Sequence, residues 1–217
     1  MRAAETKPDA LEPRERAGAR LHSTSAARNK AVIAALLAER LPEGARVLEL
    51  ACGSGEHALA VVKARPDLSW VPSDIDAEAR ASADDWARDA SGRIAPAASL
   101  DAAALGWETA ATTVDGLFCA NMIHIAPWEA CIGLFRGAGR LLAEGGLVIL
   151  YGPFLEGEAT APSNLEFDRS LKARDRRWGV RALSDVDACA AEYGFDRVER
   201  VETPANNRLL VYRRRAA

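Results

Sequence analysis

The sequence has 217 residues, is 49% hydrophobic and 27% charged, and carries a formal net charge of −3 at pH 7. This composition excludes a disordered, collagen-like or repeat chain, and the length is typical of one α/β domain. The slight negative charge argues against a general nucleic-acid binder, which needs clustered Lys and Arg to meet phosphates. No apolar stretch approaches the roughly 20 residues that span a bilayer.

From residue 25 onward, helical and strand periodicities alternate. The first helix is predicted over 25–41, where apolar residues recur at helical spacing until Pro42 and Gly44 end the run. The strands predicted after it are 46–51, 69–74, 93–100, 114–123 and 147–151, and the helices between them are 56–64, 77–90 and 128–142. This alternation favours a mostly parallel sheet with helices on both faces.

The tail of the chain follows a different pattern. Residues 152–179 are polar and longer than an ordinary connection, which favours a binding loop or lid. A helix over 185–193 precedes strands over 195–201 and 208–213, which are expected to form an antiparallel hairpin at the end of a seven-stranded sheet. Residues 1–24 lack periodicity and are predicted to form a loose arm before a single domain over 25–217.

Cysteines and histidines indicate no metal site. The four cysteines form no C-x-x-C pair, and the three histidines are far apart in the sequence. We therefore expect no metal, and free thiols in a reducing cytoplasm. The Ala- and Arg-rich start is interrupted by acidic residues, which transit peptides avoid.

The strongest local signal is a glycine turn between the first strand and the helix after it. The turn reads Glu49-Leu-Ala-Cys-Gly53-Ser-Gly55, and Asp74 ends the next strand about 20 residues later. Glycines at such a turn let the backbone approach a ligand, and an acid at this distance can accept both hydroxyls of a ribose. The pattern also fits the dinucleotide fingerprint, so an NAD-linked oxidoreductase is one alternative.

Glu49 favours a different cofactor over a dinucleotide. A carboxylate next to the turn would repel an anionic pyrophosphate, whereas S-adenosylmethionine carries an ammonium and a sulfonium. A second favourable sign is the stretch Arg140-Leu-Leu-x-x-Gly-Gly146 before an apolar strand. With the terminal hairpin, these motifs resemble the class I S-adenosylmethionine-dependent methyltransferases over about residues 28–215. That resemblance implies a Rossmann-like α/β fold.

A more specific resemblance rests on several short strings in order. They are Arg28-Asn-Lys30, Asn121-Met-Ile-His-Ile-x-Pro-Trp-Glu129, Tyr151-Gly-Pro153, Pro162-Ser-Asn-x-x-Phe-Asp168 and Pro204-Ala-Asn-Asn207. Together they are similar to the family once called domain of unknown function 938, which includes the methyltransferase-like 26 proteins. The cofactor contacts that the resemblance implies are Glu49, Ala51, Gly53, Gly55, Asp74, Ile75, Leu100, Asp101 and Asn121. The implied substrate contacts are Arg28, Asn29, Trp128, Tyr151 and Asn164.

Asn121 and His124 are the candidate catalytic residues. They follow a buried strand, at the edge where open α/β sheets bind their ligands. His124 is expected to take a proton from a hydroxyl or ammonium acceptor, or only to position it. The alternative is that Asn121 bonds loop backbone and His124 caps the next helix.

The expected function is methyl transfer from S-adenosylmethionine to N, O or S of a small molecule. Nucleic-acid and membrane partners are not expected, and the oligomeric state is open. Besides the oxidoreductase, a protein that binds S-adenosylmethionine without catalysis is the other alternative.

Overall fold

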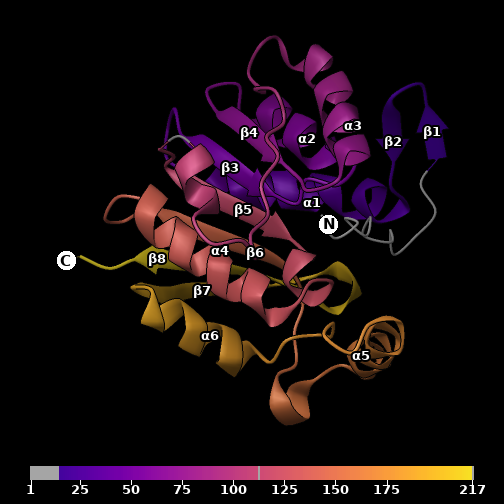
Figure 1. The fold of residues 1–217 in the computed structure, drawn as a ribbon, viewed down its shortest axis with the longest axis vertical. Coiled ribbons are helices and arrows are strands. Elements are labelled where there is room, and N and C mark those ends of the chain that lie inside the picture. Colours follow the sequence, from indigo (N-terminus) through magenta and orange to yellow (C-terminus); the bar gives the residue numbers. More distant parts are fainter. Residues whose placement is uncertain (1–14, 112, 217) are drawn as a thin grey trace, which may run out of the picture.

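The computed structural model describes residues 15–111 and 113–216. Its main sheet has six strands in the order β4-β3-β5-β6-β8-β7 (Figure 1). They are β3 (Arg46–Leu50), β4 (Ser69–Ser73), β5 (Gly116–Ala120), β6 (Leu147–Pro153), β7 (Phe195–Thr203) and β8 (Asn207–Arg214). The first four pair in parallel, while β8 runs antiparallel to both β6 and β7.

Of the seven predicted strands, the third, over 93–100, is wrong. This segment touches β4 only through isolated bridges at Ile94 and Ala98. Pro72 in β4 and Pro96 in the segment both lack the N–H that a continuous ladder requires. The predicted strands at 46–51, 69–74, 114–123 and 147–151 are confirmed with small shifts, as is the antiparallel pairing of the last two strands.

Helices cover both faces of the sheet because its side chains alternate. Val47 packs with α1 (Thr24–Arg40) and α2 (Glu56–Ala64), whereas Leu48 packs with α4 (Trp128–Leu141) and α6 (Leu183–Glu192). Figure 1 shows α4 and α6 together on one side of the sheet. The remaining helices are α3 (Ala77–Ala87), α5 (Pro162–Arg174), and the short 3-10 helices η1 (Arg88–Ala90), η2 (Trp107–Ala110), η3 (Met122–His124), η4 (Gly157–Ala159) and η5 (Pro204–Asn206).

The N-terminal segment departs from the loose arm that the sequence predicted. Residues 1–14 lie outside the described residues, but β1 (Glu15–Ala17) and β2 (Arg20–His22) form an antiparallel hairpin. The hairpin docks on α3, because Leu21 N–H donates to Ser82 Oγ at 2.8 Å and Arg20 Nε to Asp85 Oδ2 at 2.7 Å. The Arg20 guanidinium also lies over the Trp86 ring.

The polar segment that was predicted as a loop or lid over 152–179 contains α5. Its buried Asp168 accepts hydrogen bonds from Val180 N–H at 3.0 Å and from Lys172 Nζ at 2.7 Å. The bond to Val180 ties the helix to the chain that leads into α6. Among the described helices, none is both long and apolar enough to cross a membrane.

Candidate functional site

The ends of four parallel strands meet at one edge of the sheet. The glycine turn follows β3, Asp74 follows β4, Asn121 follows β5, and Gly152 lies near the end of β6. Backbone bonds lock neighbouring ends together: Cys52 N–H donates to Ser73 O, and Asn121 N–H to Tyr151 O, both at 2.8 Å. The predicted candidates from separate parts of the sequence therefore lie along one edge.

The glycine turn is held in a left-handed conformation. Ala51, Gly53 and Gly55 have φ of 57°, 58° and 86°. Glycine adopts such angles without strain, whereas an alanine does not. A Cβ on Gly55 would also lie 2.6 Å from Ala83 Cα, so this glycine lets α3 approach the turn.

Asp74 joins the glycine turn to the end of β4. Its Oδ2 accepts Gly53 N–H at 3.0 Å and its Oδ1 accepts Asp76 N–H at 2.9 Å. Asp74 does not cap α3, because Asp76 occupies the cap and accepts Glu78 N–H at 3.0 Å. Beside Asp74, Ile75 is an apolar side chain that is 51% exposed.

Glu49 is buried beneath the turn. Its Oε2 accepts Trp70 Nε1–H at 2.8 Å, and its Oε1 lies 3.8 Å from His57 Nδ1. Burial raises the pKa of Glu49 to about 8 against the opposing effect of the Trp70 bond, and the charge of Asp74 adds to the rise. Burial likewise lowers the pKa of His57 to about 4. Both groups are therefore largely neutral at pH 7.

The start of α1 meets the start of α2 behind this turn. His57 Nε2–H donates to Asn29 Oδ1 at 2.8 Å, which places one predicted substrate residue in a contact between helices. Sequence reasoning missed the buried Glu56, which accepts Ser23 N–H and Lys30 Nζ, both at 2.9 Å. Arg28, by contrast, is exposed and donates to Ser25 Oγ at 3.4 Å.

His124 and Asn121 face the same point on β6. A Cβ on Gly152 would lie 2.7 Å from His124 Nε2 and 3.0 Å from Asn121 Oδ1. His124 is 1% exposed, its Nδ1 accepts Arg181 N–H at 3.3 Å, and its Nε2 has no partner among the described residues. Burial, and then the charge of Arg181, lower the pKa of His124 to about 3.

Arg181 is a site residue that sequence reasoning missed. Its guanidinium donates to Ile123 O at 2.8 Å and to Ala126 O at 2.7 Å, and it lies 5.5 Å from the Trp128 ring centroid. The side chain thus holds the loop after β5 against the segment before α6. A single arginine in a polar stretch belongs to no motif, so the sequence offered no signal for it.

The other predicted site residues have structural contacts of their own. The Tyr151 hydroxyl accepts Asn207 Nδ2–H at 3.2 Å, and Asn164 Nδ2 donates to Asn206 O at 3.0 Å. Leu100 is buried, and Asp101 is exposed with Oδ1 accepting Ala103 N–H at 2.9 Å.

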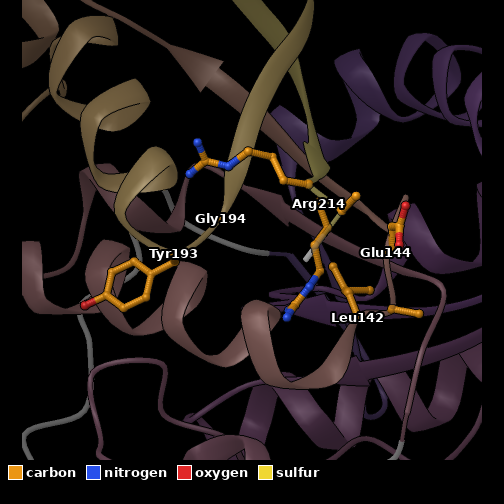
Figure 2. Close-up of a pocket in the computed structure, with 8 residues that line it drawn as sticks. Leu142, Glu144, Tyr193, Gly194 and Arg214 are labelled. Atoms are coloured by element: carbon orange, nitrogen blue, oxygen red, sulfur yellow. The ribbon is translucent and has the colours of Figure 1, made fainter.

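A surface pocket of about 320 Å³ lies at the opposite edge of the sheet (Figure 2). Arg214, at the end of β8, lines this pocket. At that end β8 pairs with the start of β6, where Arg213 lies opposite Leu147. Its other labelled residues are Leu142, Glu144, Tyr193 and Gly194. The pocket therefore contains none of the predicted site residues.

Comparisons with known proteins identify the family of this chain and the fold that it shares with solved structures. The model of the family described as "Protein of unknown function (DUF938)" matches residues 20–214. An O-methyltransferase family protein from Burkholderia thailandensis superposes with a TM-score of 0.75 at 16% identity, covering 89% of this chain and 57% of that one. An O-methyltransferase family 2 protein from Planctomyces limnophilus, in complex with apigenin, gives a TM-score of 0.72 at 21% identity, covering 88% of this chain and 60% of that one.

CalO1, a methyltransferase of calicheamicin biosynthesis in an SAH-bound form, gives a TM-score of 0.73 at 20% identity, covering 88% of this chain and 54% of that one. This chain thus spans a little over half the length of these three proteins. At such identities the likeness establishes a methyltransferase fold and leaves the reaction to be argued from the site.

Proposed function

This chain belongs to the DUF938 family, and we propose that it is a methyltransferase that takes its methyl group from S-adenosylmethionine. The observation that carries the proposal is the bond between Asp74 and Gly53 N–H, which joins a glycine turn to a carboxylate at the ligand-binding edge of a methyltransferase fold. S-adenosylmethionine supplies, when bound, a methyl group on a positively charged sulfur that a nucleophile can attack.

The residues at this edge fit such a cofactor. Asp74 accepts Gly53 N–H and Asp76 N–H at the end of β4, the position from which an acid binds ribose hydroxyls in such folds. The half-exposed Ile75 offers an apolar surface for a flat base, and the turn after β3 brings backbone N–H groups close to the ligand. The Nε2 atom of His124, which has no partner in the part of the chain that the structure describes, is a further polar atom beyond the neighbouring end of β5.

One sequence argument against a dinucleotide loses force in the structure. It assumed a charged Glu49, but burial keeps this carboxyl largely neutral at pH 7, so it would repel a pyrophosphate only weakly. The preference for S-adenosylmethionine over NAD now rests on the methyltransferase fold shared with the SAH-bound CalO1.

The chain's own contribution to transfer would be to hold two reactants in line and close together. We propose a small-molecule acceptor, because the net charge of −3 provides no excess of cations for nucleic acid. We further propose a cytoplasmic location, since all four cysteines are buried free thiols.

Titration calorimetry with S-adenosylmethionine, S-adenosylhomocysteine and NAD tests the cofactor assignment. We expect the first two to bind and NAD not to bind. Asp74→Ala should weaken binding by about 1–3 kcal/mol, the range for losing hydrogen bonds to a charged group. Asp76→Ala is the matched control, because it removes the α3 cap at a cost of about 1 kcal/mol of stability and should leave affinity unchanged.

Binding of NAD alone, or equal affinity of the wild type and Asp74→Ala, would contradict the assignment. Cofactor binding without turnover on a metabolite extract would identify a non-catalytic binding protein instead.

A further inference from the structure

Two backbone groups meet the His124 ring: Arg181 N–H points at Nδ1 at 3.3 Å, and a backbone contact with Gly179 raises the pKa of the ring. The Arg181 contact has hydrogen-bond geometry, so we infer the tautomer from it. A backbone N–H can only donate, so the contact from Arg181 N–H requires a lone pair on Nδ1. In the neutral ring the proton then resides on Nε2. His124 therefore presents an N–H donor toward the point shared with Asn121 and Gly152.

This donor has no acceptor among the described residues, although the side chain is 1% exposed. Buried donors are nearly always satisfied, and an unsatisfied one costs about 1–3 kcal/mol. A lone pair on a bound ligand is the partner that would satisfy it.

The surroundings of His124 favour an anionic ligand. The Phe154 ring packs against it edge-on at 5.2 Å, and Arg181 supplies a nearby positive charge. The carboxylates that act on Arg181 are Asp168 of α5 and Glu129 of α4. The described neighbours of the His124 ring are the backbone of Gly179 and Arg181, the Phe154 ring and Gly152, and none of these groups is a base that takes a proton from an acceptor.

We propose, resting on the function above, that the methyl acceptor is a small carboxylic acid whose carboxylate His124 Nε2–H binds. One carboxylate oxygen accepts this hydrogen bond, and the other attacks the methyl carbon. A C–O bond forms as the C–S bond breaks, and the electron pair of the C–S bond stays on sulfur. The products are a methyl ester and S-adenosylhomocysteine, and no proton moves. An acceptor that is already ionised at neutral pH needs no general base, which agrees with a histidine that presents only a donor.

The donor can be tested without knowing the acceptor. Long-range ¹H–¹⁵N NMR on histidine-labelled protein distinguishes the two neutral tautomers, and His22→Gln, His57→Gln and His124→Gln assign the signals. We expect His124 as the Nε2–H tautomer without titration between about pH 5.5 and 8.5, a range around the ordinary histidine pKa of ~6.5. An Nδ1–H tautomer, or a titration midpoint within that range, would overturn the proposal.

The acceptor class is tested by the lability of the product. The protein is incubated with ¹⁴C-methyl S-adenosylmethionine and a metabolite extract, and the products are treated with mild alkali. A methyl ester releases labelled methanol, as we expect, whereas an ether or N-methyl product keeps its label and would overturn the acceptor class while leaving methyl transfer intact. If no labelled product forms, both the acceptor class and the proposed function are refuted.

Two variants separate a donor from a base once the ester is identified. The amide N–H of His124→Gln reaches about as far as Nε2–H, so we expect kcat/KM within about tenfold of the wild type, whereas His124→Leu should lose about 10–100-fold, as for a hydrogen bond to a charged group. Calorimetry with S-adenosylhomocysteine and thermal melting check that both variants fold and bind. Equal loss in the two variants would refute the donor role.

Discussion

The left-handed glycine that begins α2 should be needed for packing as well as for backbone conformation. In Gly55→Ala the new Cβ would lie 2.6 Å from Ala83 Cα, about 0.8 Å short of the 3.4 Å at which ordinary contact begins. Because the neighbour is helix backbone, α3 has to move. Ser82 Oγ binds Ser54 O at 2.7 Å and Leu21 N–H at 2.8 Å, so this movement strains two further bonds.

The cost of Gly55→Ala has two parts. A left-handed φ costs an alanine about 1–2 kcal/mol, and overpacking costs about 1–3 kcal/mol. Gly44→Ala is the matched control, because Gly44 has φ of 69° but nothing within 4 Å of its Cβ position. The control should lose only the first part, whereas Gly55→Ala should lose about 2–5 kcal/mol in all.

Urea unfolding followed by tryptophan fluorescence measures both free energies, and the protein has five tryptophans. If Gly55→Ala and Gly44→Ala differ by less than about 0.5 kcal/mol, within the error of such extrapolations, the proposed contact with α3 is absent.

Three further changes test the electrostatics and packing of the site. Because burial raises the pKa of Glu49 to about 8, the folded protein holds a proton that the unfolded chain has lost. The free energy of unfolding should therefore fall as pH rises from 6.5 to 8, by up to about 1.4 kcal/mol per pH unit. Glu49→Gln should flatten this slope in urea titrations. Equal slopes in the variant and the wild type would refute the protonated state of Glu49. His57, with its lowered pKa, acts in the opposite direction only below about pH 6.5. Gly152→Ala should shift the His124 ring signals in NMR, since its Cβ would lie 2.7 Å from Nε2, whereas Gly157→Ala adds a Cβ in open space and should leave them in place. Arg181→Lys keeps the charge but loses the bonds to Ile123 O and Ala126 O, so it should lower the free energy of unfolding by about 2–4 kcal/mol. An equal melting temperature for this variant and the exposed control Arg177→Lys would show that the loop after β5 does not depend on the guanidinium.

The sequence was sufficient to predict a strand where burial on both faces of the sheet produces a continuous apolar run. β3, β5 and β6 lie in the middle of the sheet, and their apolar segments predicted them within a few residues. The predicted end of β5 was too late, because the apolar residues Met122 and Ile123 continue the run into η3 after the left-handed turn at Asn121. Periodicity records burial, and it cannot distinguish a strand from a buried turn.

The errors arise where tertiary contacts decide the structure. β1 and β2 have three residues each and are too short for a recognisable pattern, so docking on α3 specifies the hairpin. Helix α5 has few apolar residues and is held by the buried Asp168. The protonation of Glu49 and the tautomer of His124 depend on burial and on Arg181 N–H, which no motif encodes.

The insertion of β8 between β6 and β7 has a consequence for biosynthesis. β7 emerges from the ribosome before β8, yet β8 is the strand that it pairs with in the sheet. Until residues 207–214 have been translated and released from the exit tunnel, β6 has an open edge and β7 has no partner strand. Open strand edges pair readily with other chains, so a ribosome that stalls after β6 has left the tunnel would expose the edge of β6 and leave a nascent chain prone to aggregation and dependent on chaperones.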